Sequence, residues 1–208
     1  MNKPNLSIII PAKDEEESLD LLCDEISTTL KNLNKSYEII IIDDGSKDHT
    51  FEIAKKIKLK NSNIKIIQLR GNFGKSIALQ VGFDIAIGDI IFTMDADLQD
   101  NPKEIPVFLN KIEEGYDMVS GWKKKRFDPS ITKVIPSRII NFLTRLLTRV
   151  QIHDTNCGFK AYKREVIQNL NLYGELYRFI PILAAKQNFK VTEVVVEHRV
   201  RKFGKTKF

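Results

Sequence analysis

The stretch Ile90-Ile91-Phe92-Thr93-Met94-Asp95-Ala96-Asp97 places a mostly apolar run directly before two carboxylates. A short run of this kind is typical of a strand that is buried on both faces of a parallel sheet. Residues two apart in extended chain point to the same side, so Asp95 and Asp97 should converge where the strand ends. Open parallel sheets bind their ligands at this edge. The stretch therefore predicts an α/β fold and the position of its site.

The same alternation of apolar runs and helical patterns extends through the first 120 residues. Apolar runs predict strands, and the amphipathic stretches between them predict helices. The expected strands are 6–11, 37–43, 64–69, 89–94 and 117–120, and the expected helices are 15–33, 50–60, 76–86 and 102–114. Beyond them we expect a basic loop at 123–133, helices at 136–149 and 172–185, and a strand at 191–196. This pattern predicts a mostly parallel central sheet with helices on both faces.

Charge is divided unevenly along the 208 residues. The formal net charge of +6 combines a balance of −7 in residues 1–120 with one of +13 in residues 121–208. An acidic part beside a basic part suggests metal binding in the first and anion binding in the second. A solvated lysine-rich surface is the alternative explanation.

Cysteine and histidine usage excludes several classes of protein. Cys23 and Cys157 lie far apart, which fits a reducing compartment and provides no disulfide framework. The three histidines are scattered and suggest no zinc site. The N-terminus lacks a secretory signal, and no run reaches the roughly 18 apolar residues that span a bilayer. We therefore expect a protein on the cytosolic side.

Carboxylate oxygens after the 89–94 strand suit a hard cation such as Mg2+ or Mn2+. Asp95 and Asp97 are the expected ligands, and Gln99 and Asp100 are close enough to join or position them. Such a cation could bridge two phosphates and offset the charge on a leaving diphosphate. An EF-hand is excluded, because Gln99 and Asp100 stand where it needs Asp or Asn and Gly. A helix cap or a solvated turn is the structural alternative.

Two more turns follow predicted strands. In Asp43-Asp44-Gly45-Ser46, glycine permits a tight turn, and a carboxylate could accept hydrogen bonds from a base or a ribose. Arg70-Gly71-Asn72-Phe73-Gly74-Lys75-Ser76 combines glycines and cations before a helix, which favours phosphate binding. It is not a P-loop, because Leu69 stands where glycine is required. Clustered cations at 198–207 could bind phosphate or anionic lipid, or could form a solvated tail.

Six blocks in order resemble family 2 glycosyltransferases, and most closely the polyprenyl-phosphate branch that includes dolichyl-phosphate mannose synthases and bactoprenol glucosyltransferases. The blocks are residues 10–16, 43–46, 70–75, 94–100, 153–162 and 198–207. The resemblance covers essentially the whole chain. It implies a GT-A fold and an inverting transfer of a sugar from a UDP- or GDP-linked donor to a polyprenyl phosphate.

The resemblance and the motifs together predict the role of each site residue. The donor nucleotide would contact Pro11, Glu15, Asp43, Asp44, Lys75, Asp95, Arg201 and Lys205. Asp95, Asp97 and Gln99 would hold the metal, and Lys123, Lys133 and Ser137 would contact the acceptor phosphate. The family usually has arginine at the position of Lys123 and often at that of Lys133; lysine keeps the charge and loses the bidentate fork.

Asp154 falls at the position of the family's proposed catalytic base. A lipid monophosphate is already mostly ionised near neutral pH, since its second pKa is roughly 6. Its oxygen is then a nucleophile that needs less help from a base than a hydroxyl would. Asp154 could instead orient the acceptor or a cation.

The leading hypothesis is a single glycosyltransferase catalytic domain over 1–208, with a nucleotide- and metal-binding half at 1–120 and a basic acceptor-binding half at 121–208. It would work at the cytoplasmic face of a membrane, and homo-oligomers are compatible with it. Members of that family usually continue into membrane helices, so we expect such helices to be missing after residue 208.

Three alternatives come from different classes. A soluble family 2 glycosyltransferase would act on a saccharide hydroxyl. A processive polysaccharide synthase is disfavoured, because its Gln-x-x-Arg-Trp signature is absent. A nucleic-acid-binding module would interleave aromatic and basic residues on a stacking platform. It also leaves Asp95 and Asp97 unexplained, so we expect no nucleic-acid partner.

Overall fold

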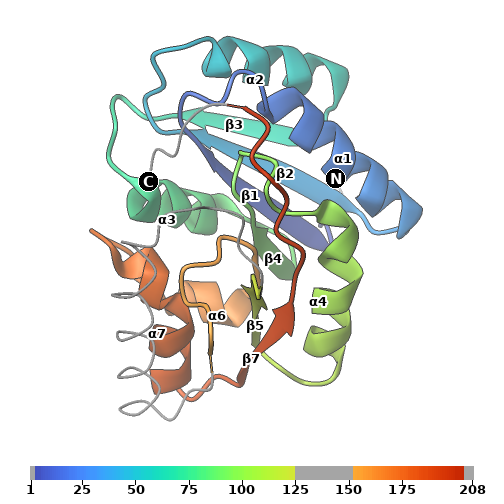
Figure 1. The fold of residues 1–208 in the computed structure, drawn as a ribbon, viewed down its shortest axis with the longest axis vertical. Coiled ribbons are helices and arrows are strands. Elements are labelled where there is room, and N and C mark those ends of the chain that lie inside the picture. The colour runs from blue at the N-terminus through green and yellow to red at the C-terminus, as the bar shows by residue number, and fades with distance from the viewer. Residues whose placement is uncertain (1–2, 125–151, 204–208) are drawn as a thin grey trace.

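The computed structural model describes residues 3–124 and 152–203 (Figure 1). In these residues a seven-stranded sheet has the order β3-β2-β1-β4-β6-β5-β7. The strands are β1 (Leu6–Ala12), β2 (Tyr37–Asp43), β3 (Ile64–Gln68), β4 (Ile90–Thr93), β5 (Met118–Trp122), β6 (Lys160–Lys163) and β7 (Val191–Val195). Strand β1 lies parallel to β2 and β4, β2 to β3, and β5 to β7, whereas β6 runs antiparallel to β4 and β5. The predicted α/β class with a mostly parallel sheet is confirmed.

Helices cover both faces of the sheet (Figure 1). One face packs against α1 (Leu19–Asn32), α2 (Thr50–Lys60) and α4 (Ile105–Glu113), and the other against α3 (Lys75–Ile85), α6 (Arg164–Gln168) and α7 (Ile180–Lys186). The position of strand β1 between two cores explains why its sequence is mostly apolar. Ile8 and Ile10 pack in the first core, while Ile9 between them packs in the second. Neither face of the strand meets water, so its side chains are apolar apart from Ser7, whose buried hydroxyl donates to Glu38 Oε1 (2.5 Å).

Helix boundaries differ from the prediction at three places. Helix α1 begins at Leu19 instead of residue 15, and the backbone N–H of Glu15 in the preceding turn donates to Thr50 Oγ1 (2.7 Å). The helix expected at 102–114 is split into a 3-10 helix, η1 (Pro102–Glu104), and α4. The one expected at 172–185 starts late, because Gly174 has a φ of 53°; a second 3-10 helix, η2 (Leu176–Phe179), then leads into α7. The helix predicted at 136–149 lies outside the described residues.

Strand β6 and the short helix α6 were not predicted from the sequence. Strand β6 has only four residues, and two of them are lysines, so it shows no recognisable hydrophobic pattern. It inserts between β4 and β5, where Lys160 is in register with Thr93 on one side and Ser120 on the other. Because β6 runs the opposite way, its first residue lies beside the last residue of β4 and two residues before the end of β5. A lysine is thereby placed at the ligand-binding edge of the sheet.

Residues 196–203, which we call the C-terminal strap, return from β7 across the carboxyl end of the sheet (Figure 1). The backbone N–H of Val196 donates to Trp122 O (3.1 Å), and that of Arg199 donates to Gln99 O (3.0 Å). The strap therefore covers the loop after β4, where the metal ligands were predicted.

None of the described helices combines the length and the apolar character that crossing a bilayer requires.

Candidate functional site

Four of the predicted donor-side residues, Pro11, Glu15, Asp43 and Asp44, lie where β1 and β2 end. These strands pair in register up to Ala12 and Asp43, so the loops that follow them start side by side. Asp43 is fully buried and accepts a hydrogen bond from the backbone N–H of Ser46 (3.2 Å). Glu15, just beyond Pro11, lies 3.8 Å from Arg201 of the strap.

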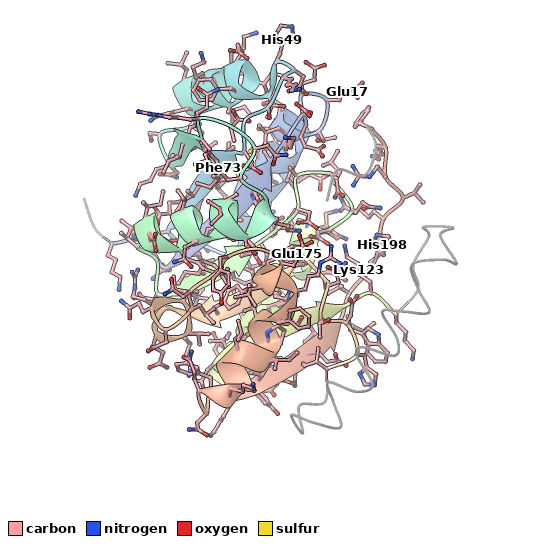
Figure 2. All side chains as sticks on the ribbon, turned by 90° about the vertical axis from the view of Figure 1, so that its left-hand side faces the viewer. Glu17, His49, Phe73, Lys123, Glu175 and His198 are labelled. Atoms are coloured by element: carbon pink, nitrogen blue, oxygen red, sulfur yellow. The ribbon has the colours of Figure 1, made fainter. Side chains whose placement is uncertain are left out.

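Asp44 joins two turns that the sequence suggested separately. Its buried carboxylate accepts hydrogen bonds from the backbone N–H groups of Phe73 (2.7 Å) and Gly74 (2.9 Å). Gly45 has a φ of 66°, and a Cβ on it would lie 2.5 Å from the carbonyl carbon of Gly71. Only glycine fits this approach. The turn after β2 and the turn after β3 therefore form one unit, from which Phe73 projects outward (Figure 2).

Asp95, just beyond β4, forms an ion pair with Lys75 at the start of α3. Burial raises the pKa of Asp95, but the charges of Lys75 and Lys123 outweigh it and hold that pKa below its usual range. The backbone of Gly158 lies against the Asp95 carboxylate, so that a Cβ there would overlap it. Asp95 is thus an ionised carboxylate in a fixed position.

The surroundings of Asp97 destabilise the ionised form of its carboxylate. Its Oδ2 lies 2.5 Å from Nη2 of Arg201, and its Oδ1 accepts a hydrogen bond from the backbone N–H of Gln99 (3.0 Å). Burial, followed by the charges of Asp95 and Asp100, nevertheless raises the pKa of Asp97 to about 6. A group with a raised pKa gains from any added positive charge.

These residues fit a divalent cation that is held only in part by the protein. Asp95 and Asp97 offer carboxylate oxygens, and buried Gln99 offers an amide oxygen beside them. Within the described ranges, no three His, Cys, Asp or Glu side chains converge as a metal-binding group. Mg2+ commonly binds one or two carboxylates and completes its shell with phosphate oxygens and water. The set therefore suits a cation that shares its ligands with a diphosphate.

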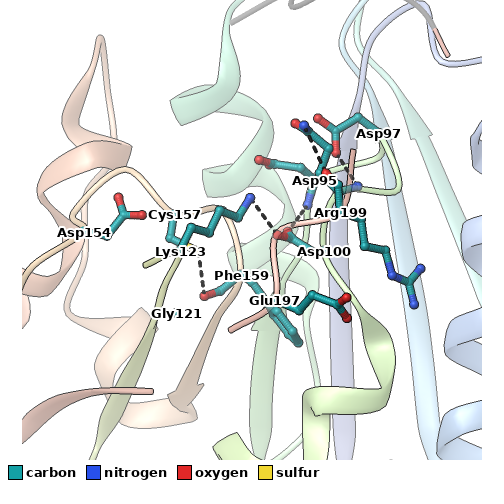
Figure 3. Close-up of polar contacts among 12 residues, drawn as sticks. Asp95, Asp97, Asp100, Gly121, Lys123, Asp154, Cys157, Phe159, Glu197 and Arg199 are labelled. Carbon is teal, nitrogen blue, oxygen red and sulfur yellow. Dashed lines mark hydrogen bonds and ion pairs between the residues drawn. The ribbon is translucent and has the colours of Figure 1, made fainter. Parts of the chain in front are cut away.

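Lys123, just beyond β5, pairs with Asp100 at 2.9 Å, and their side chains are 8% and 0% exposed. Figure 3 shows the Lys123 side chain extending between Asp154 and Asp100. Burial lowers the pKa of Lys123, but Asp100 reverses this effect and raises it above its usual range. Lys123 is therefore a charged lysine that links the β5 end to the loop after β4, and its contact with an acceptor phosphate stays a prediction.

Asp154 lies on a buried turn, residues 154–158, that precedes β6. Its Oδ1 accepts a hydrogen bond from the backbone N–H of Asn156 (3.2 Å). Thr93 Oγ1 donates to Gly158 O (2.7 Å), which ties the end of this turn to β4. The turn brings Asp154 to the same side of the sheet as Lys123 and Asp100 (Figure 3).

The structure thus gathers most of the predicted residues at one edge of the sheet. Lys133, Ser137 and Lys205 lie outside the described residues. Sequence reasoning missed the buried Lys160 and the close approach of Gly158 to Asp95. Arg199 belongs to the clustered cations predicted at 198–207, and its Nη1 lies 2.7 Å from Glu25 Oε2. A signal existed for Lys160, since a lysine flanked by Phe159 and Ala161 interrupts an apolar run.

Comparisons with known proteins bear on the family of this chain. The model of the family described as Glycosyl transferase family 2 matches residues 7–170. The chain is 35% identical over 207 residues to the dodecaprenyl-phosphate galacturonate synthase of Rhizobium johnstonii, covering 98% of this chain and 61% of that protein. It is 38% identical over 211 residues to an undecaprenyl-phosphate 4-deoxy-4-formamido-L-arabinose transferase of Yersinia pestis, covering 100% and 64%. The chain spans less than two thirds of the length of these relatives.

Solved structures share the fold at lower identity. Mycobacterium tuberculosis glucosyl-3-phosphoglycerate synthase superposes with a TM-score of 0.72 at 22% identity, over 95% of this chain and 73% of that one. The same enzyme in complex with Mn2+, UDP-glucose and phosphoglyceric acid gives 0.71 at 21%, over 95% and 72%. These likenesses confirm the GT-A fold expected from the sequence.

Proposed function

Because this chain belongs to glycosyl transferase family 2, we propose that it transfers a sugar from a nucleoside-diphosphate donor to a polyprenyl phosphate, with inversion at the anomeric carbon. The observation that carries the proposal is the pairing of two carboxylates, Asp95 and Asp97, with two cations, Lys75 and Arg201, at the end of β4. The names of two relatives that align with nearly the whole chain describe sugar transfer involving polyprenyl phosphates.

Donor binding would use the ends of β1, β2 and β4. Asp95, Asp97 and Gln99 would hold a divalent cation, Mg2+ or Mn2+, which stabilises the leaving diphosphate as a Lewis acid when it is bound. Lys75 and Arg201 stand beside the metal ligands and would contact diphosphate oxygens through charge-assisted hydrogen bonds. Lys205 would join them.

The nucleoside would lie over the linked turns after β1 and β2. Pro11, Glu15 and the buried Asp43 would line its pocket, with Asp43 available to a base edge or a ribose hydroxyl. Asp44 would act on the nucleoside indirectly, by holding the turn, because its carboxylate already binds the backbone of Phe73 and Gly74. The donor would be UDP- or GDP-linked.

Acceptor binding would use the basic half. Lys123, Lys133 and Ser137 would contact the acceptor phosphate, one oxygen of which attacks the anomeric carbon as the bond to the donor diphosphate breaks. Asp154 lies on the same side of the sheet as Lys123. An ionised phosphate has no proton to lose, so Asp154 would orient the acceptor instead of removing a proton.

We place this reaction in a single catalytic domain over 1–208 that works at the cytoplasmic face of a membrane. Polyprenyl chains are confined to bilayers, and the basic balance of residues 121–208 would favour an anionic membrane surface.

The first experiment is the thermal stability of the protein with UDP and with GDP, each with and without Mn2+. A ligand that binds only the folded state raises the melting temperature. We expect a metal-dependent rise with one of the two nucleotides, and none in the Asp97→Ala variant. Well-folded wild-type protein that shows no rise with either nucleotide would contradict the donor site.

Transfer is then measured as release of the nucleoside diphosphate from UDP- and GDP-sugars, with undecaprenyl phosphate or with a panel of saccharides as acceptor. We expect release that depends on the lipid phosphate. Release that depends only on a saccharide would instead favour a family 2 enzyme that acts on hydroxyls, for which Asp154 would be a base.

A further inference from the structure

Lys160 is the buried lysine that the proposed mechanism does not use. It is 3% exposed and lies at the start of β6, in register with Thr93 of β4 and Ser120 of β5. It makes no ion pair with any residue that the structure describes, in contrast with Lys75 and Lys123. Burying a lysine without an ionic partner costs free energy, so its position at the ligand-binding edge suggests a functional role.

Its ammonium group donates a hydrogen bond to the carbonyl oxygen of Cys157. Cys157 belongs to the 154–158 turn, whose first residue is Asp154. The next carbonyl, that of Gly158, accepts from Thr93 Oγ1 (2.7 Å). Lys160 and Thr93, which are neighbours in the sheet, therefore hold two successive carbonyls of one turn.

The same turn separates the donor and acceptor sides of the site. Gly158 at its end lies against the Asp95 carboxylate, while Asp154 at its start lies beyond Lys123 (Figure 3). Asp95 has a second support, the ion pair with Lys75. A loosened turn would therefore displace Asp154 more than Asp95.

Charge reinforces this arrangement. Burial lowers the pKa of Lys160, and Lys75 lowers it further, while Asp154 and Asp95 oppose the shift. Asp154 at the start of the turn and Asp95 beside its end thus both act on the Lys160 ammonium group.

We propose that Lys160 is a positioning residue for sugar transfer, which holds the 154–158 turn against the ends of β4 and β5 and so fixes Asp154 relative to the donor. The inference rests on the proposed function. Misplacing a reacting or orienting group by about 1 Å can cost on the order of a hundredfold in rate. Lys160 would therefore affect the transfer step and leave donor binding largely intact.

The test replaces Lys160 by Met, which keeps the length of the side chain and removes both its charge and its donors. Lys163→Met is the matched control: Lys163 is on the same strand, but it pairs with Asp117 at the opposite end (2.8 Å). The measurements are the rise in melting temperature with UDP–Mn2+ and GDP–Mn2+, and kcat and donor KM for release of the nucleoside diphosphate with undecaprenyl phosphate. Lys160→Gln serves if the Met variant does not fold.

We expect Lys160→Met to lower kcat by roughly ten- to a hundredfold, with donor KM and the nucleotide-dependent rise in melting temperature unchanged, and Lys163→Met to retain full kcat. Combining Lys160→Met with Asp154→Asn should cost no more than about threefold beyond the worse single variant, because both changes act on one group.

Three results would overturn the inference. They are an unchanged kcat in Lys160→Met, losses that multiply in the double variant, and a loss of nucleotide binding that accounts for the loss of rate. Wild-type protein that binds nucleotide and metal but transfers no sugar to the lipid phosphate would overturn the proposed function, and this inference with it.

Discussion

The two strands that flank β1, β2 and β4, both lead into carboxylates, but different groups bind these carboxylates. Strand β2 ends at Asp43 and Asp44, and β4 is followed by Asp95 and Asp97. Asp44 accepts hydrogen bonds from the backbone N–H groups of Phe73 and Gly74, within the acidic half of the chain. Asp97 pairs with the side chain of Arg201, more than one hundred residues away. Asp44 is thus held by two backbone N–H groups, whereas Asp97 accepts one backbone hydrogen bond, from Gln99, and pairs with a charged side chain.

This difference indicates that the β2 end is a fixed scaffold, whereas the group that binds the carboxylate at the β4 end can be exchanged. Backbone N–H groups cannot leave Asp44 without unfolding the turn that they belong to. A guanidinium group can leave Asp97 when another cation takes its place, and then carries its own charge to an anion. We infer that the β2 end gives the donor pocket its shape and that the β4 end exchanges charge with a metal and a diphosphate.

The largest expected effect is on turnover at the β4 end. Asp97→Ala should lower kcat by roughly a thousandfold, since electrostatic stabilisation of the leaving group is the largest contribution that the site can make. Asp154→Asn should cost less, roughly ten- to a hundredfold, because an ionised acceptor needs orientation more than a base. Steady-state release of the nucleoside diphosphate measures both. Comparable losses in the two variants would contradict the orienting role of Asp154.

The first 120 residues could be predicted well because each of their elements carries its own signal. Strands such as β1 and β2 are buried on both faces. The turn at Gly45 needs a glycine because its backbone has a positive φ. The carboxylates after β4 were found for the same reason, since they immediately follow an apolar run.

The basic half was harder because its structure depends on distant partners. Strand β6 is too short to show a period, and its antiparallel insertion depends on pairing with β4 and β5. The pairing of Arg201 with Asp97, and that of Lys123 with Asp100, joins segments that no local pattern connects. The resemblance to family 2 indicated that these cations matter, but not which carboxylate each one contacts.

A smaller effect is expected on the free energy of unfolding, which should change in opposite directions when the two strand ends are mutated. Asp44→Asn should lower the free energy of unfolding by about 2 kcal/mol, because an amide NH2 would replace one of the two oxygens that accept from Phe73 and Gly74, and so would face an N–H donor. Asp97→Asn should raise it by about 1–2 kcal/mol at pH 7.5, because a carboxylate with a raised pKa is ionised there at a cost. Urea unfolding without metal or nucleotide measures both variants.

The dependence on pH sharpens this prediction. The pKa of Asp97 is about 6 in the folded protein, above that of an unfolded aspartate. Its contribution to stability is therefore present at low pH and lost as the pH rises through 6. The advantage of Asp97→Asn over the wild type should shrink between pH 7.5 and pH 5. An advantage that grows on acidification would mean that Arg201 already neutralises Asp97.

The smallest expected effect tests the exchange of charge itself. Arg201→Gln should tighten the binding of Mn2+ alone by roughly fivefold at low ionic strength, because it removes the cation that competes for Asp97. The same variant should weaken the binding of nucleotide with Mn2+, since it also removes a ligand of the diphosphate. Electron paramagnetic resonance of free Mn2+ follows the first change, and calorimetry follows the second.

Arg199→Gln is the matched control, because Arg199 lies on the same strap but contacts Glu25 and Asn101 instead of a predicted metal ligand. It removes the same charge at nearly the same place, so a general change in the electrostatic field would affect both variants alike. Only direct competition for Asp97 makes Arg201→Gln bind Mn2+ more tightly than Arg199→Gln does. If the two variants bind Mn2+ equally, the Arg201–Asp97 ion pair does not compete with the metal, and the β4 end resembles the β2 end more than its contacts suggest.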